Sequence, residues 1–217
     1  MIDPERVAIA TPIGDGKPYW QYMRSILALD RKRLFGPIFS ICGCSDIVEA
    51  RNRLVRTALA SAIPWDQLVF IDADMGFTLE DWGYLLDDSD GAAAVCAEYS
   101  AKGEPRRKAP WPMGFCRLSR ALLERLASMQ IEGELLIPRY DNQDGQETLD
   151  FFESGMRGPR LRLAEDQGFW SLLSSLERAG FEGFRVRYET RTRLVHVGMA
   201  EYPYTPELPD PPVHRAP

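Results

Sequence analysis

The stretch 68-LVFIDADMGF-77 carries a short apolar run directly into two aspartates that flank one alanine. Leu68 to Ile71 are typical of a buried strand, because brief continuous apolar runs bounded by polar residues occur inside sheets. In a parallel α/β sheet the carboxyl ends of the strands form the ligand-binding edge, and Asp72 and Asp74 stand at that end. The sequence therefore predicts a polar site at the end of an inner strand.

Asp72 and Asp74 are two residues apart, so alternation along an extended chain is expected to send both side chains to the same side. A divalent cation would relieve the repulsion between them, since Mg²⁺ and Mn²⁺ prefer carboxylate oxygens and keep substrate phosphate oxygens in their shell. The simpler alternative is that both aspartates cap the next helix or begin a turn, where Asp is common. The DAD motif alone does not decide between them.

Strand-like and helix-like segments alternate on both sides of this stretch. The strand-like segments are 6–12, 37–43, 68–74 and 91–99, and the helix-like segments are 19–35, 45–62 and 78–90. Thr78 and Asp81 have the spacing of a capping box at the start of a helix. Strands that alternate with helices in this way predict a mostly parallel α/β sheet flanked by helices on both faces.

Beyond residue 100 the pattern is less regular. Residues 113–129 are expected to form a short strand that leads into a helix, 140–160 a long loop, and 163–180 another helix. Residues 181–198 alternate apolar and charged side chains, as a late strand would. The proline-rich tail, 201–217, is expected to be extended or disordered.

The composition fits one soluble domain. A chain of 217 residues with 45% hydrophobic content can build one good core, and no apolar run reaches the ~20 residues that cross a bilayer. The net charge of −6 does not favour whole-surface attraction to nucleic acid or anionic membrane. The cysteines lack CxxC spacing and the N-terminus lacks a signal-like segment, so a cytoplasmic location is expected.

The helix expected over 45–62 carries an arginine inside its apolar face. At about 100° per residue, Arg51 falls near the middle of an arc of apolar side chains. That arc consists of Ile47, Val48, Leu54, Val55, Ala58, Leu59 and Ala62. A buried guanidinium needs a carboxylate, a phosphate or a base edge; the structural alternatives are an ion pair with a strand-end aspartate or snorkelling. Asn52 lies at the edge of the arc and offers an amide.

Two later features carry chemistry of their own. Glu165 and Asp166 open the helix expected over 163–180, where acids are favourable with the helix dipole and mean little alone. His196 lies on the apolar side of the alternating segment and is followed two residues later by Gly198. A lone histidine in such a place is more often a satisfied core residue than a ligand.

In their order along the chain, these motifs resemble GT-A-fold glycosyltransferases of the family-2-like kind, including compact bacterial and phage members. The resemblance covers residues 7 to about 198 and rests on VAIATP, EARNRLVRTAL, LVFIDADMGFTLEDW, AEY followed by SAK, MGFCRLSRALLERL, EDQGFW and TRLVHVG. A DxD motif alone is weak; a DxD, then an ED pair, then a late His before Val-Gly is more specific.

The resemblance implies a single GT-A, or nucleotide-diphospho-sugar transferase, domain over residues 1–200. Residues 1–100 would form the nucleotide-sugar-binding half and 101–200 the acceptor half, with 201–217 as a C-terminal tail. It implies a metal-dependent enzyme that moves a sugar from a nucleotide-sugar, a UDP-sugar being favoured, to an acceptor hydroxyl. The cofactor would be Mn²⁺ or Mg²⁺. The resemblance does not settle inverting against retaining stereochemistry.

On the donor side, the resemblance assigns Thr11 and Pro12 to a nucleoside-facing turn, and Arg51 and Asn52 to the base or phosphate side. The DAD turn, with Ala73 at its centre, would also contact the donor.

The same resemblance places Asp72, Asp74 and His196 at the metal. Asp72 resembles the ribose or outer-shell aspartate, Asp74 the direct ligand, and His196 the third protein-side ligand. Asp166 resembles the general base of inverting members, and Glu165 would orient that base or the acceptor.

On the acceptor side, Trp111 and Gly114 are the expected contacts. A carbohydrate or glycoconjugate stacking on Trp111 is one possible acceptor. Phage DNA with hydroxylated bases is another, because residues 104–111 and 157–193 are rich in arginine; the alternative there is an ordinary solvated face.

Two other classes of function stay open. A nucleotidyltransferase shares the α/β architecture and the carboxylate-held metal. However, the segment TPIGDGKP after the first strand is not a glycine-rich basic loop of the kind that would cradle a triphosphate. A non-catalytic nucleotide-sugar-binding module is the other class. The presence of Asp72, Asp74, Asp166 and His196 argues against it.

Overall fold

The computed structural model describes residues 2–14, 16–101, 104–108, 111–142, 144–152, 165–197 and 201–203. For residues 101, 104–108, 165–166 and 201–203 it describes the backbone only. Within these residues, no helix is both long and apolar enough to cross a membrane.

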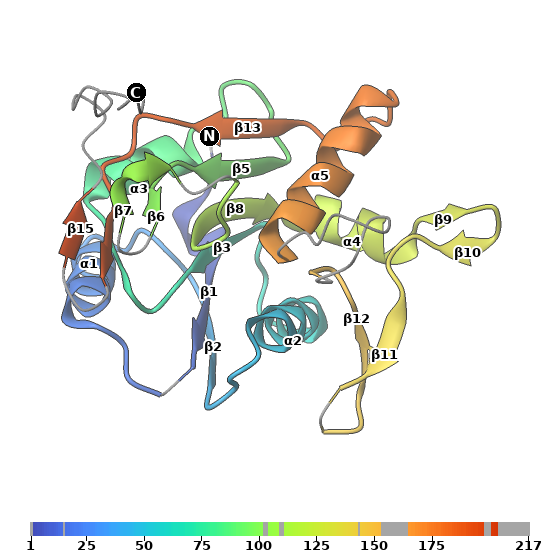
Figure 1. The fold of residues 1–217 in the computed structure, drawn as a ribbon, viewed down its shortest axis with the longest axis horizontal. Coiled ribbons are helices and arrows are strands. Elements are labelled where there is room, and N and C mark those ends of the chain that lie inside the picture. The colour runs from blue at the N-terminus through green and yellow to red at the C-terminus, as the bar shows by residue number, and fades with distance from the viewer. Residues whose placement is uncertain are drawn as a thin grey trace, which may run out of the picture.

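A six-stranded sheet forms the centre of the molecule (Figure 1). Its strands are β1 (Val7–Ile13), β2 (Ile38–Cys42), β3 (Gln67–Ile71), β5 (Ala94–Ala97), β8 (Phe115–Ser119) and β13 (Val186–Glu189), in the order β13-β5-β8-β3-β1-β2. β1 pairs in parallel with β2 and β3, and β5 pairs in parallel with β13. β8 lies antiparallel between β3 and β5. The predicted mostly parallel sheet is confirmed.

Helices cover both faces of this sheet. The helices are α1 (Trp20–Asp30), α2 (Ile47–Ala60), α3 (Leu79–Leu86), α4 (Arg120–Ser128) and α5 (Glu165–Arg178). Buried side chains of α2, α4 and α5 pack with Leu68 and Phe70 of β3 on one face. Those of α1 and α3 pack with Val69 and Ile71 on the other face. β3 is therefore buried on both sides, as its apolar run predicts.

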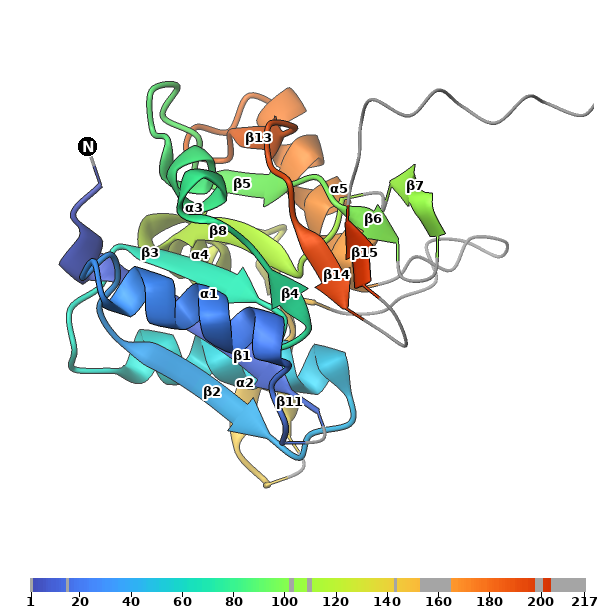
Figure 2. The same ribbon diagram turned by 90° about the vertical axis from the view of Figure 1, so that its left-hand side faces the viewer.

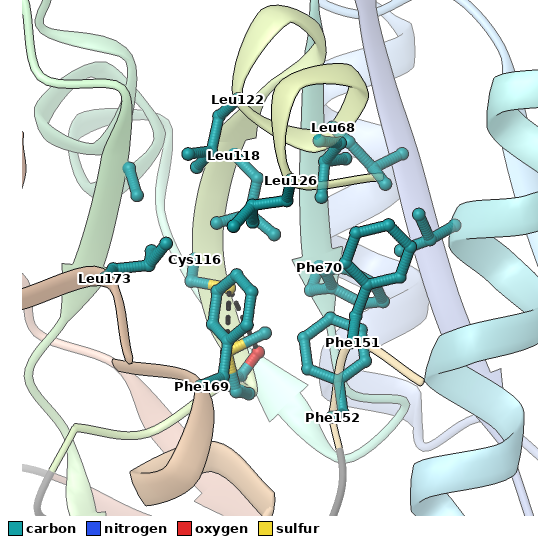
Figure 3. Close-up of a cluster of buried hydrophobic side chains, with 14 of the residues drawn as sticks. Leu68, Phe70, Cys116, Leu118, Leu122, Leu126, Phe151, Phe152, Phe169 and Leu173 are labelled. Atoms are coloured by element: carbon teal, nitrogen blue, oxygen red, sulfur yellow. Dashed lines mark hydrogen bonds between the residues drawn. The ribbon is translucent and has the colours of Figure 1, made fainter. Parts of the chain in front are cut away.

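Figure 3 shows the larger of these two cores. Leu122 and Leu126 of α4 lie over the sheet, while Phe70, Phe152 and Phe169 come from three different segments. The ring centroids of Phe70 and Phe152 lie 5.6 Å apart, and those of Phe152 and Phe169 lie 4.9 Å apart. These contacts place the first turns of α5 at the same end of the sheet as the end of β3.

Helix boundaries agree with the local signals in the sequence. Asp46 accepts hydrogen bonds from Val48 and Glu49 at the start of α2. The capping box at α3 is confirmed: the Asp81 N–H donates to Thr78 Oγ1 at 3.2 Å, and the Thr78 N–H donates to Asp81 Oδ2 at 2.8 Å.

Small strands extend the fold beyond the central sheet. A second sheet contains β4 (Met75–Gly76), β14 (Val195–Val197) and β15 (Glu201–Pro203), in the order β15-β14-β4. Three hairpins pair β6 (Ser100–Ala101) with β7 (Glu104–Lys108), β9 (Gln130–Ile131) with β10 (Glu134–Leu135), and β11 (Arg139–Asp141) with β12 (Glu147–Leu149). A 3₁₀ turn, η1 (Pro4–Arg6), precedes β1. In Figure 2, β4, β14 and β15 lie together beyond the end of β3.

The expectation of one alternating strand over 181–198 is wrong. The segment divides into β13, in the central sheet, and β14, in the second sheet. The chain turns after β13 because the Glu189 carboxylate accepts hydrogen bonds from the backbone N–H and the guanidinium of Arg191. The segment expected to be a long loop, 140–160, instead contains the β11–β12 hairpin in its described part.

Candidate active site at the end of β3

The DAD motif forms a turn that three distant segments hold in place. The Asp72 N–H donates to the Gly114 carbonyl at 2.9 Å, and the Tyr19 N–H donates to the Ala73 carbonyl at 2.9 Å. The Val197 N–H donates to the Asp74 carbonyl at 2.8 Å. Each residue of the motif is thus tied to a different part of the chain, which fixes the turn without using its two carboxylates.

The two carboxylates of this turn have different partners, contrary to the expectation from alternation. β3 ends at Ile71, and the Met75 N–H closes a turn on the Asp72 carbonyl at 3.0 Å. Because the chain is no longer extended at Asp72, the period of two does not apply. Asp72 lies against Arg51, and Asp74 lies against His196.

Arg51 is buried and bound to the first aspartate. Its side chain is only 5% exposed, and Nη2 lies 3.2 Å from Asp72 Oδ1 and 3.3 Å from Oδ2. This is the ion pair with a strand-end aspartate that the sequence offered as the structural alternative for Arg51. The guanidinium compensates the negative charge of Asp72, whereas the Asp74 carboxylate faces the imidazole of His196.

Gly114 and Tyr99 complete the surroundings of Asp72. The Gly114 N–H donates to the Tyr99 hydroxyl at 3.0 Å, and a Cβ on Gly114 would lie 2.5 Å from that hydroxyl oxygen and 2.7 Å from Asp72 Oδ2. Burial, followed by the charge of Asp72, raises the pKa of Tyr99 well above its usual range, so the hydroxyl stays neutral. Gly114 is therefore required by close approach to Asp72.

Gly114→Ala is expected to displace the Asp72 carboxylate and to destabilise the fold by about 1–3 kcal/mol, as overpacking does. Gly83→Ala is the matched control, because nothing lies within 4 Å of a Cβ at that helical glycine. Urea denaturation of both variants measures the difference. Equal stability of the two would show that Tyr99 and Asp72 relax at no cost.

His196 reaches the DAD turn through β14. This strand pairs with β4, with His196 opposite Met75, and brings Nε2 of His196 within 3.5 Å of Asp74 Oδ2. The other ring nitrogen, Nδ1, lies 3.2 Å from the Ser100 carbonyl. A carbonyl only accepts, so Nδ1 donates in this contact, and Nε2 is the ring nitrogen that faces the Asp74 carboxylate. With a neutral ring, Nε2 and the carboxylate are two acceptors side by side, an arrangement that a cation between them would satisfy.

The Asp74–His196 pair fits a divalent metal whose other ligands come from elsewhere. One carboxylate oxygen and one imidazole nitrogen suit Mn²⁺, and a carbonyl on the second ring nitrogen is the usual way in which a metal-ligating histidine is oriented. Among the described residues, no group of three or more His, Cys, Asp or Glu gathers around one point. The protein side that the structure describes therefore consists of Asp74 and His196, with Asp72 held by Arg51.

The residues expected on the nucleoside side lie in β1 and in α2. Thr11 is fully buried, with its hydroxyl 2.8 Å from the Tyr22 hydroxyl, and Pro12 is paired in register with Ile41 inside the sheet. β1 continues to Ile13, so the turn begins after these residues and not at them.

Asn52 of α2 holds a different segment. Its Nδ2 donates to Asp150 at 2.7 Å, and its Oδ1 accepts from the Phe152 N–H at 3.2 Å. Tyr140 donates to Glu49 of the same helix at 2.5 Å. Asn52 therefore anchors the segment after the β11–β12 hairpin.

Trp111 belongs to an aromatic cluster. Its ring centroid lies 5.2 Å from that of Tyr188 and 6.2 Å from that of Trp170, and 38% of the residue is exposed. Trp111 has a φ of +51°, a conformation that is costly for a bulky side chain. The exposed part of the Trp111 ring is suited to stacking on a ligand.

The expectations for the acid pair of α5 and for the arginine-rich segment remain to be compared with the structure. The Glu165 and Asp166 side chains lie outside the described residues, as does Gly198, although the backbone of the acid pair begins α5. Two of the late arginines form ion pairs: Arg187 pairs with Asp90, and Arg191 pairs with Asp87 and Glu189.

The sequence analysis missed Tyr99 and Ser100. Tyr99 ends the inner strand expected over 91–99 and Ser100 follows it; in the structure both come after β5, in the way that Asp72 comes after β3. Polar residues at the carboxyl end of a second inner strand were a usable signal, because such ends meet at one edge of the sheet.

No family model matches the chain, and no curated protein matches it in sequence. Solved structures do match. They include glucosyl-3-phosphoglycerate synthase from Mycobacterium tuberculosis in complex with phosphoglyceric acid, which is 12% identical with a TM-score of 0.51 over 89% of this chain and 72% of that chain. The same enzyme with Mn²⁺, UDP-glucose and phosphoglyceric acid matches over the same shares, at 12% identity and a TM-score of 0.50.

The catalytic domain of Drosophila β1,4-galactosyltransferase 7 with xylobiose is also 12% identical, with a TM-score of 0.48, over 92% of this chain and 68% of that chain. At such identities the likeness concerns the fold. The chain has the GT-A fold, as the motifs predicted.

Proposed function

We propose that this protein is a metal-dependent glycosyltransferase that moves a sugar from a UDP-sugar to an acceptor hydroxyl. The observation that carries the proposal is the Asp74–His196 pair, in which Nε2 of the imidazole and Oδ2 of the carboxylate lie 3.5 Å apart at the end of β3 in a GT-A fold. In that fold, the glucosyl-3-phosphoglycerate synthase of M. tuberculosis binds Mn²⁺ and UDP-glucose. The same chemistry suits the two side chains found here.

Asp74 and His196 would hold Mn²⁺, or Mg²⁺, from the protein side. A bound divalent ion would supply charge neutralisation for the diphosphate leaving group. The chain's own contribution is to fix the two ligands: Ser100 orients the imidazole, and β14 holds Asp74 through the Val197 N–H. Asp72, clamped by Arg51, keeps a carboxylate edge for donor hydroxyls, because its side chain is still 23% exposed.

For the acceptor side we propose the two acids at the start of α5. The Phe70, Phe152 and Phe169 contacts bring the first turns of α5 to the end of β3, where the donor is expected. Asp166 would act as the general base that removes the proton from the acceptor hydroxyl, and Glu165 would orient it. Trp111, beside Tyr188, offers a ring for an acceptor sugar to stack on.

A carbohydrate or glycoconjugate acceptor fits these residues better than modified DNA. Arg187 and Arg191 are bound to Asp87, Asp90 and Glu189, so they offer little free positive charge to a phosphate backbone. No observation in the described part of the chain supports DNA binding, which depends on unneutralised Lys and Arg.

The test is a thermal-shift panel of UDP-glucose, UDP and UTP with and without Mn²⁺. A ligand at 100 times its dissociation constant stabilises by about 2.7 kcal/mol, which for a chain of this size raises the melting temperature by about 5–10 °C. We expect this rise with UDP-glucose and UDP, only when Mn²⁺ is present. A larger rise with UTP, and turnover of UTP with a sugar phosphate, would indicate a nucleotidyltransferase instead. No Mn²⁺-dependent rise with any nucleotide would refute the proposal.

His196→Ala separates a ligand histidine from a core histidine. As a ligand, its loss should weaken Mn²⁺ binding in the presence of UDP by at least about tenfold with little change in the melting temperature of the free protein. A core role predicts the opposite: lower stability and unchanged Mn²⁺ affinity. Calorimetric titration of Mn²⁺ and a melting curve on the same sample decide between the two.

A further inference from the structure

The outer side of α1 carries an exposed apolar stripe. Trp20 is 66% exposed, Leu27 44% and Met23 37%, and their spacing of three and four residues places them along one side of the helix. The opposite side, with Tyr22, is buried against the sheet. We call Trp20, Met23 and Leu27 the α1 outer face. Figure 2 looks onto this helix, which runs across the outside of the sheet.

This stripe differs from the other exposed hydrophobic residues. The other exposed large apolar side chains after α1 do not share a helix or strand with one another: Ile38, Ile47, Ile63, Leu79, Trp111, Ile131 and Phe181. Isolated exposed hydrophobic residues are normal and need no explanation. Three on less than two and a half turns of one helix form a continuous surface, which indicates that this side of α1 contacts something.

The same helix is basic in a protein that is acidic. Residues 16–33 hold five Lys or Arg and one acid, Asp30, whereas the whole chain has a net charge of −6. At about 100° per residue, Arg24 and Arg31 lie within about 40° of Trp20 around the helix axis. Both are exposed, and neither makes an ion pair with any residue that the structure describes.

The helix dipole accounts for only part of this pattern. Cations near a helix C-terminus are favourable, so Arg31, Lys32 and Arg33 would be explained by the dipole alone. The dipole does not explain Arg24 in the second turn, or the exposed Trp20 beside it. A Trp-containing apolar stripe flanked by Lys and Arg is the composition of helices that lie in a membrane interface.

We propose that the α1 outer face docks the protein on an anionic membrane surface. Trp20, Met23 and Leu27 enter the headgroup region, and the flanking cations contact lipid phosphates. Anionic lipid is the partner because Arg24 and Arg31 lie along one flank of the apolar stripe and complement negative charge, while the rest of the acidic surface is repelled by it. This docking does not depend on the proposed transferase activity.

Docking in this way would bring the candidate active site to the membrane. The N–H of Tyr19, which precedes Trp20, donates to the carbonyl of Ala73 inside the DAD motif, so the start of α1 borders the site. If the proposed function holds, an acceptor carried by a lipid would be presented directly to that site. This consequence rests on the proposed function, whereas the lipid binding itself does not.

The experiment is co-sedimentation with vesicles of phosphatidylcholine and phosphatidylglycerol (7:3), with pure phosphatidylcholine vesicles as the comparison. The test variants are Trp20→Ser with Leu27→Ser, and Arg24→Gln with Arg31→Gln. The matched control, Ile131→Ser with Phe181→Ser, removes exposed apolar side chains elsewhere. We expect the wild type and the control to bind the anionic vesicles, and each test variant to bind at least about tenfold more weakly.

The outcomes are distinguishable. Absence of wild-type binding to the anionic vesicles would overturn the proposal, and so would equal binding by the wild type and both test variants. The alternative partner for this face is a second copy of the chain, which sedimentation velocity without vesicles tests. A wild-type dimer that dissociates when Trp20 and Leu27 are replaced would assign the face to that second copy. Because the substituted side chains are exposed, the variants should melt like the wild type. Quenching of wild-type tryptophan fluorescence by brominated lipid provides a readout that needs no variant.

Discussion

Asp74→Asn is expected to abolish Mn²⁺-dependent binding of UDP and UDP-glucose while leaving the fold intact. The substitution keeps the shape of the side chain and the backbone contact to Val197, but it removes the negative charge that faces His196. A neutral amide is a poor ligand for a divalent cation, so we expect the affinity for Mn²⁺ in the presence of UDP to fall by about 100-fold or more. Calorimetric titration measures it.

The control for this prediction is Asp141→Asn. Asp141 is an exposed acid in the β11–β12 hairpin, and its loss changes the net charge by the same amount. Comparison of the two variants separates loss of a ligand from a general change in electrostatic attraction. Wild-type Mn²⁺ affinity in Asp74→Asn would remove Asp74 from the metal site and with it the main support for the proposed function.

The parts of the site that lie within one helix or strand could be predicted from the sequence. The arc of apolar residues in α2 located Arg51 on a buried face, and burial of an arginine required a partner, which proved to be Asp72. The apolar run before the DAD motif located the end of β3 to within three residues, since the strand stops at Ile71. Both inferences rest on periodicity, which is a local property of the chain.

The relation between the two aspartates could not be predicted in the same way. Alternation held only while the chain was extended, and the turn after Ile71 sent Asp72 to Arg51 and Asp74 to His196. Whether a strand continues for two more residues depends on pairing with other strands. Here β8 ends its pairing with β3 at Ile71, opposite Phe115.

The position of His196 next to Asp74 also could not be predicted from local periodicity. Alternation over 181–198 placed His196 on the apolar side of one long strand, but the structure divides that segment into β13 and β14. What brings His196 to Asp74 is the pairing of β14 with the two-residue strand β4, and so short a strand has no periodic signal of its own. The prediction that His196 belongs to the site came from the order of the motifs along the chain, and not from the alternation of apolar residues. The fold then supplied the Ser100 contact that orients it.

Arg51→Ala is expected to destabilise the protein by about 3 kcal/mol, because removing one partner of a buried ion pair leaves the other charge uncompensated. Asp72 would remain beside the buried Tyr99 hydroxyl and the Gly114 backbone, with less than a quarter of its side chain in contact with solvent. The cost should therefore fall when Asp72 is neutralised as well. Urea denaturation of the two single variants and of the double variant Arg51→Ala with Asp72→Asn forms the required cycle.

We expect the double variant to be at least about 1 kcal/mol more stable than the sum of the two single changes implies, since coupled charges in contact are not additive. Arg53→Ala is the matched control on the same helix, because Arg53 pairs with the exposed Asp144 and exposed pairs contribute little. Donor binding gives the second readout. If Arg51 also contacts donor phosphate, the double variant should bind UDP more weakly than Asp72→Asn alone, whereas a purely structural pair predicts equal UDP affinity for these two variants. Additive stabilities in the cycle would mean that Arg51 and Asp72 do not interact in solution.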